Sequence, residues 1–111
     1  MLRLLMSFVL HFTDANFSKE IEKGIVLVDF FAMWCAPCRR LTPILEQVAE
    51  AFKDKVKIGK VDIDQEQKTA SQFQVSSVPT LILFKDGKEI DRILGLRNFE
   101  DLKHFIDNVL P

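Results

Sequence analysis

The sequence predicts an α/β domain in which a mixed β-sheet is covered by helices on both faces. Strand-like and helix-like stretches alternate along most of the chain. Residues 25–32 are apolar at both alternating sets of positions apart from one Asp, as expected of a strand buried on both faces. Near the end of the chain, a turn signal joins two apolar stretches into an antiparallel hairpin, so the predicted sheet is mixed.

The first part of the chain predicts a strand, a short helix and the central strand. Residues 7–13 are typical of a strand at or near a sheet edge. Thr13 or Asp14 can then cap a short helix that carries Phe17 and Ile21 inward and ends at Gly24. The buried strand at 25–32 follows directly, and no other stretch is as apolar on both faces.

The middle of the chain predicts a long amphipathic helix, a strand and a short helix. In the first helix, apolar residues recur at i, i+3, i+4, i+7 and i+11, namely at Leu41, Ile44, Leu45, Val48 and Phe52. Residues 56–63 alternate as a strand does, and residues 65–74 form the short helix.

The last part predicts a hairpin and a closing helix. Strands at 80–84 and 89–94 flank residues 85–88, in which Asp86-Gly87 is a tight-turn signal. The final helix starts at Asn98 and buries one apolar stripe, formed by Phe99, Leu102, Phe105, Ile106 and Val109. The predicted order is therefore β-α-β-α-β-α-β-β-α.

Both cysteines of the chain, Cys35 and Cys38, lie between the central strand and the helix that follows it. The C-x-x-C spacing puts their sulfurs within reach of one another across the first turn of that helix. A helix N-terminus offers unpaired N–H groups and a partial positive charge, which favour the thiolate that attacks disulfides. We therefore predict a redox dithiol in which Cys35 is the nucleophile and Cys38 the resolving thiol. Pro37 suits the first helical turn, because its missing N–H would have no intrahelical partner there.

Composition excludes several classes of function. At 111 residues the chain has the length of one domain, residues 1–111, and its 15 basic and 16 acidic residues are scattered, with a net charge of −1. This pattern offers no basic stripe for nucleic acid and no polybasic cluster for a membrane surface. The two histidines are far apart and only two cysteines are present, so we expect no closed zinc site.

The first twelve residues resemble a short signal peptide, but the resemblance is poor. Ser7 interrupts the apolar stretch, His11 ends it, and no small-x-small cleavage site follows. The stretch is also too short to span a membrane as a helix. We expect residues 1–6 to be a dispensable extension, with Met6 as an alternative start, and we expect a cytoplasmic protein, because a lone C-x-x-C in a reducing compartment is typically catalytic.

Several motifs, in order and at the expected separations, resemble the thioredoxin family over about residues 8–110. They are V-D-F-F-A at 28–32, W-C-A-P-C at 34–38, Pro43, K-V-D at 60–62, V-P-T at 78–80 and Gly95. The resemblance implies a five-stranded thioredoxin fold with about four helices. It also implies a monomeric protein-disulfide reductase that acts on disulfide-containing target proteins, binds no cofactor and is recharged by an NADPH-dependent thioredoxin reductase. Ala36 replaces the Gly of most thioredoxins, so Ala36 and Pro37 are expected to tune the reduction potential and the fit to the reductase.

Asp29 interrupts the apolar central strand at a position that points to the same face as Ile25 and Leu27. Its carboxyl should be buried and its pKa raised by desolvation. The resemblance assigns it as the acceptor of the Cys38 proton, through a water; the alternative is a carboxylate that caps a backbone group or pairs with a lysine. Lys60 is the candidate partner that would moderate the pKa of Asp29, although a lysine at a strand end can equally extend its ammonium to solvent.

Val78 and Pro79 end a polar loop at the start of a strand, where a proline is ordinary. The resemblance implies more: a cis peptide that faces the dithiol, with Val78 pairing its backbone with an extended substrate. It also implies that Trp34, Ile63, Val78 and Gly95 form an apolar rim that docks partner proteins. The alternative for these residues, Ile63 above all, is plain core packing.

The sequence thus favours a thiol-disulfide oxidoreductase that reduces protein disulfides, and two other interpretations remain open. A thiol oxidant or isomerase usually carries His at the position of Pro37, so Pro37 favours a reductant. The fold can also serve as a redox-independent binding subunit, and a cysteine-free variant that still supports a partner would identify that role.

Overall fold

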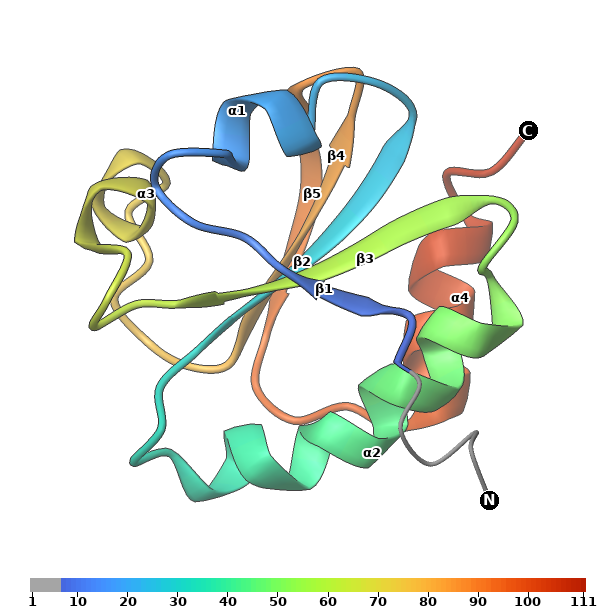
Figure 1. Ribbon diagram of the computed structural model, residues 1–111. Coiled ribbons are helices and arrows are strands. Elements are labelled where there is room, and N and C mark those ends of the chain that lie inside the picture. The colour runs from blue at the N-terminus through green and yellow to red at the C-terminus, as the bar shows by residue number, and fades with distance from the viewer. Residues whose placement is uncertain (1–6) are drawn as a thin grey trace.

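The computed structural model describes residues 7–111 and contains a five-stranded sheet with helices on both faces (Figure 1). The predicted order of elements is confirmed. The elements are β1 (Val9–His11), α1 (Phe17–Glu20), β2 (Ile25–Phe31), α2 (Ala36–Ala51), β3 (Val56–Asp62), α3 (Gln67–Gln72), β4 (Thr80–Lys85), β5 (Lys88–Leu94) and α4 (Phe99–Asp107). The proposed extension at residues 1–6 lies outside the described residues.

The strand order in the sheet is β1-β3-β2-β4-β5, with β1, β3 and β2 parallel and β4 and β5 antiparallel. The sheet is mixed, as the hairpin predicted. β2 lies at the centre, hydrogen-bonded to β3 on one side and β4 on the other. Its first six residues are fully buried, which explains why it reads as a continuous apolar run.

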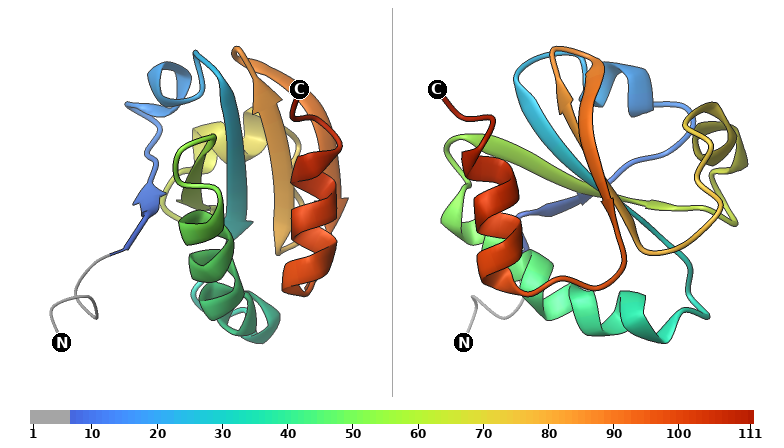
Figure 2. Two further views of the ribbon diagram at one scale, coloured as in Figure 1. Left: turned by 90° about the vertical axis from the view of Figure 1, so that its right-hand side faces the viewer. Right: turned by 180° about the vertical axis from the view of Figure 1, so that it is seen from behind.

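Two separate cores cover the two faces of the sheet. α2 and α4 lie together on one side, and α1 and α3 lie on the other (Figures 1 and 2). The core beneath α2 and α4 is mainly aliphatic and includes Leu27, Leu41 and Ile58. The core on the opposite face is rich in phenylalanine: the rings of Phe12, Phe17, Phe30, Phe73 and Phe84 lie 5.1 to 6.4 Å apart in tilted or edge-to-face pairs.

Three elements are shorter than their sequence patterns suggest. β1 spans three residues where residues 7–13 were expected, and the Phe12 ring belongs to the aromatic core on the other face. α1 starts only after Asn16, because the backbone first turns at Thr13, whose hydroxyl accepts the Asn16 N–H at 3.2 Å. α3 begins at Gln67, because the Asp62 carboxylate holds the preceding residues in a turn.

Gly59 in β3 allows the closest approach between the sheet and the aromatic core. A Cβ atom at this position would overlap the Phe12 ring. Gly59 therefore lets Phe12 lie flat against the sheet at the strand that carries Lys60 toward the functional site.

Candidate functional site

The two cysteines lie where β2 ends and α2 begins, at the C-terminal end of the central strand. Cys35 is the N-cap of α2, and its Sγ accepts the backbone N–H of Cys38 at 3.1 Å. The pair forms a disulfide with a Cα–Cα distance of 5.2 Å. Pro37 lies in the first turn of α2, as predicted, and Ala36 beside it is exposed. The helix therefore directs its N-terminal N–H groups and the positive end of its dipole at Cys35, a place that favours a thiolate.

Loops from three other parts of the chain surround the sulfurs. Cys35 and Cys38 are only 4% and 2% exposed, and Phe31, Ile63 and Val78 pack against them. The Val78 carbonyl oxygen lies 3.8 Å from the Cys35 Sγ atom, so this backbone faces the disulfide.

The peptide between Val78 and Pro79 is cis, as the resemblance implied. The Pro79 carbonyl accepts the Gly95 N–H at 2.8 Å, and Gly95 has a φ of 90°, which favours glycine. The structure therefore brings Val78, Pro79 and Gly95 together beside the dithiol.

Trp34 extends the apolar surface next to Cys35. Its side chain is 68% exposed, and its indole N–H donates to the Asp64 carboxylate at 2.9 Å. Met33 beside it is 70% exposed, whereas Ile63 is half-buried and contacts both the aromatic core and the cysteines. Asp64 was not identified from the sequence, although its place directly after Ile63 could have suggested it.

Asp29 is the one fully buried acidic residue of the described chain, and it points toward the face covered by α2. Neither of its carboxylate oxygens accepts a hydrogen bond from residues 7–111. Burial raises the pKa of the Asp29 carboxyl from 3.8 to about 7, and the positive charge of Lys60 offsets part of this rise. The alternative of a carboxylate that caps a backbone group or forms a close ion pair does not match this geometry, because the oxygens have no such partner among the described residues.

Lys60 is the register partner of Asp29 on β3, but its ammonium does not form an ion pair with the Asp29 carboxylate. The Nζ atom lies 4.4 Å from the centroid of the Phe31 ring and 3.4 Å from the Thr42 hydroxyl oxygen. Lys60 therefore acts on Asp29 through its charge at a distance. Neither Phe31 nor Thr42 was singled out from the sequence, although Thr42 lies one helical turn beyond Cys38.

Arg39, expected to be a solvated residue of α2, holds the loop before Cys35. Its guanidinium donates to the Met33 carbonyl oxygen at 2.9 Å. This bond joins the first turn of the helix to the segment between β2 and Cys35.

This arrangement can carry out thiol-disulfide exchange. One sulfur sits at a helix N-terminus, the second lies one turn inside, a backbone carbonyl faces the first, and a carboxyl that titrates near neutral pH lies beneath the helix. A carboxyl of this pKa can exchange protons with a thiol at neutral pH. Within residues 7–111, no cluster of His, Cys, Asp or Glu could hold a metal ion, and no helix is long and apolar enough to cross a membrane.

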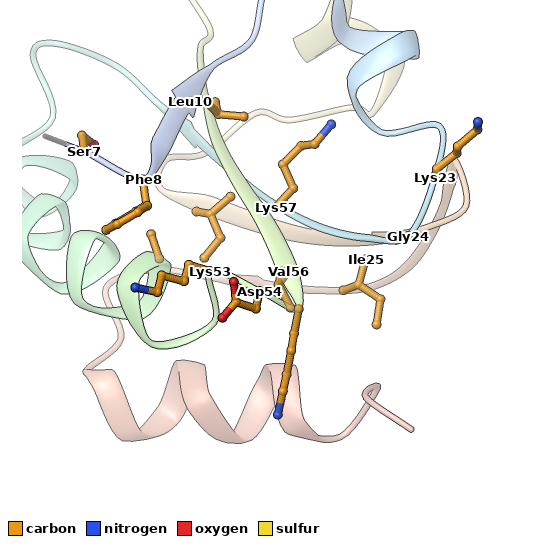
Figure 3. A pocket seen from close by; sticks show the side chains of 13 residues that line it. Ser7, Phe8, Leu10, Lys23, Gly24, Ile25, Lys53, Asp54, Val56 and Lys57 are labelled. Atoms are coloured by element: carbon orange, nitrogen blue, oxygen red, sulfur yellow. The ribbon is translucent and has the colours of Figure 1, made fainter.

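A hollow of about 500 Å³ lies far from the dithiol, at the N-terminal ends of β2 and β3 beside Ile25 and Val56 (Figure 3). The side chains of Lys23, Lys53 and Lys57 surround it but point away from one another, so they do not form a common anion site. The chemistry-bearing groups instead lie at the opposite end of the parallel strands, where open α/β sheets usually bind ligands.

Comparison with known proteins agrees with this geometry. The family model "Thioredoxin" matches residues 8–108. A thioredoxin of Staphylococcus aureus (strain Mu50 / ATCC 700699) is 43% identical over 98 residues, which cover 88% of this chain and 94% of the relative. A thioredoxin of Staphylococcus haemolyticus (strain JCSC1435) is 44% identical over the same length and shares. The matches and the C-x-x-C pair support a thiol-disulfide oxidoreductase with a redox-active disulfide and no prosthetic group, and the chain belongs to the thioredoxin family.

Proposed function

We propose that this protein reduces disulfides in target proteins, with Cys35 as the nucleophile and Cys38 as the resolving thiol. The observation that carries the proposal is the place of Cys35 at the N-cap of α2, where its sulfur accepts a backbone N–H. An attacking thiolate gains most from such a donor and from the helix dipole. Cys38 lies inside the first turn and is more deeply buried, as a thiol that reacts only within the molecule can be.

The exchange balances in two steps. The Cys35 thiolate attacks one sulfur of the target disulfide, forms a mixed disulfide and releases the other target sulfur as a thiolate. Cys38 then loses its proton and attacks the Cys35 sulfur, which releases the second target sulfur and leaves the Cys35–Cys38 disulfide. Two electrons pass from the dithiol to the target.

In this proposal Asp29 takes up the Cys38 proton, through a water, during the second step. A pKa of about 7 makes the carboxyl a base that is poised at neutral pH, and Lys60 keeps that pKa from rising further. Val78 and Pro79 bind the extended target segment, and Trp34, Ile63 and Gly95 complete the docking rim. The exposed Trp34 and the carbonyl of Val78 beside Cys35 support these assignments.

The oxidised pair is recharged, in the same proposal, by an NADPH-dependent thioredoxin reductase. We place the protein in the cytoplasm as a monomer, where a reductase can keep the dithiol reduced. Ala36 and Pro37 lie between the two sulfurs and tune the reduction potential. Pro37 favours a reductant over an oxidant or isomerase.

Two cysteine variants test the roles of the thiols. Cys35→Ser should abolish reduction of a disulfide-containing protein by dithiothreitol-charged enzyme, because the attacking thiolate is gone. Cys38→Ser should instead accumulate covalent adducts with the target on a non-reducing gel. Activity of Cys35→Ser above a few per cent of wild type, or a clean gel for Cys38→Ser, would exclude the assigned roles.

The reduction potential of the Cys35–Cys38 pair separates a reductant from an oxidant. Reference values are about −270 mV for thioredoxin itself, which is the family's own value and not one worked out for this chain, and about −180 mV for protein disulfide isomerase. We expect equilibration against glutathione at neutral pH to give a value near the first. A value above about −200 mV would overturn the assignment as a reductase.

A further inference from the structure

The Lys60 ammonium occupies a fixed place beside the site that the thioredoxin-type mechanism does not by itself explain. It lies against the Phe31 ring, 4.4 Å from the centroid, and 3.4 Å from the Thr42 hydroxyl oxygen. The Thr42 hydroxyl in turn donates to the Cys38 carbonyl oxygen at 3.3 Å. Thr42 thus accepts from Lys60 and donates to the backbone of the resolving cysteine.

The same ammonium is the charged group that lowers the pKa of the buried Asp29 carboxyl. A row of register partners crosses the sheet on the α2 face, in the order His11, Lys60, Asp29, Leu81 and Ile93. His11 is exposed at the edge of the sheet, and the residues on the far side of Asp29 are apolar. From α2 and α4, the core that covers this face contributes apolar side chains, among them Leu41, Leu45, Leu102 and Ile106.

An ammonium on a long side chain would otherwise extend into water, which would weaken its pull on the carboxyl. The Phe31 ring attracts the cation and the Thr42 hydroxyl accepts one of its hydrogens, so two contacts oppose that movement. We propose that Thr42 is a positioning residue: its hydroxyl, together with the Phe31 ring, holds the Lys60 ammonium near Asp29 and so sets the pH range in which Asp29 accepts the Cys38 proton. This inference rests on the proposed role of Asp29 as the proton acceptor.

The test compares Thr42→Val, which keeps the shape but removes the hydroxyl, with Thr42→Ser, which keeps the hydroxyl. The Asp29 carboxyl is titrated by NMR in the oxidised protein, where the disulfide cysteines do not titrate. We expect Thr42→Val to raise the Asp29 midpoint by roughly 0.5 to 1 pH unit, a threefold to tenfold gain in proton affinity, and Thr42→Ser to restore it. His11→Gln serves as a matched control, because it removes the other titratable group of the row without touching Thr42.

A second comparison shows whether Thr42 acts through Lys60. In a Lys60→Gln background, Thr42→Val should cause no further rise in the Asp29 midpoint. An unchanged midpoint in Thr42→Val, a full effect in the Lys60→Gln background, or no rescue by Thr42→Ser would each overturn the inference. Because Thr42 is exposed, the variants should fold, and circular dichroism checks this directly.

The titration is independent of any exchange reaction, so the two proposals can fail separately. If Asp29→Ala leaves the rate of Cys38 resolution unchanged, the acceptor role of Asp29 is lost, whatever the midpoint in Thr42→Val. If the role of Asp29 stands, the rate of resolution in Thr42→Val should rise with pH along the same displaced midpoint as the NMR titration.

Discussion

Asp29→Ala should stabilise the oxidised protein at high pH but not at low pH. The folded state raises the pKa of the Asp29 carboxyl to about 7, against 3.8 for an ordinary Asp. Between these two pH values the folded protein binds a proton that the unfolded chain does not, so the free energy of unfolding falls as pH rises. Each pH unit of difference corresponds to about 1.4 kcal/mol, so the wild type loses about 4 kcal/mol of stability between about pH 4 and pH 8.

Alanine removes this penalty but leaves a small cavity, whose cost does not depend on pH. The difference in the free energy of unfolding between Asp29→Ala and wild type should therefore shift by about 4 kcal/mol in favour of the variant from about pH 4 to pH 8. Urea unfolding at both pH values, followed by far-UV circular dichroism, measures it, and other titrating groups cancel in the difference. Val28→Ala, on the same strand and facing the opposite core, should show a pH-independent difference. A shift of less than about 1 kcal/mol for Asp29→Ala would refute the reasoning.

Three further substitutions probe how the fold supports the site. Gly59→Ala should destabilise the protein by about 1–3 kcal/mol, because the new methyl group overlaps the Phe12 ring; a neutral result in urea unfolding would contradict this. Asn98→Ala should cost about 1 kcal/mol, since the Asn98 side chain accepts the Asp101 N–H at 2.8 Å as the N-cap of α4, and Asn98→Asp should retain most of the stability. Phe17→Leu should lose about 1–2 kcal/mol through its aromatic pairs, with no change in reduction potential; a changed potential would link the aromatic core to the dithiol.

The sequence predicted the architecture well because the strands and the long helix carry strong periodic patterns. The uninterrupted apolar run of β2 and the apolar stripe of α2 each allow only one arrangement on the sheet. The ends of α1 and α3 were less predictable, because local side-chain bonds, such as that from Asn16 to Thr13, decide where so short a helix begins.

For the site, the sequence identified the residues whose type is unusual for their place, such as two cysteines at a strand end or an acid within an apolar strand. Burial and the raised pKa of Asp29 agree with the expectation from alternation along β2. Contacts that depend on side-chain direction were not predicted. Neither the bond between Trp34 and Asp64 nor the contact of Lys60 with Thr42 leaves a periodic signal, because each joins ordinary residues from separate elements.

The place of Trp34 also determines what light reports about this molecule. The chain has one Trp, no Tyr and ten Phe. Its near-ultraviolet emission therefore comes essentially from a single indole, 68% exposed and adjacent in sequence to a sulfur of the disulfide. Since a disulfide quenches a neighbouring indole, the fluorescence should brighten on reduction while the aromatic core remains optically silent. Intrinsic emission is thus a built-in gauge of the electron balance of the dithiol, and a poor gauge of whether the sheet is intact.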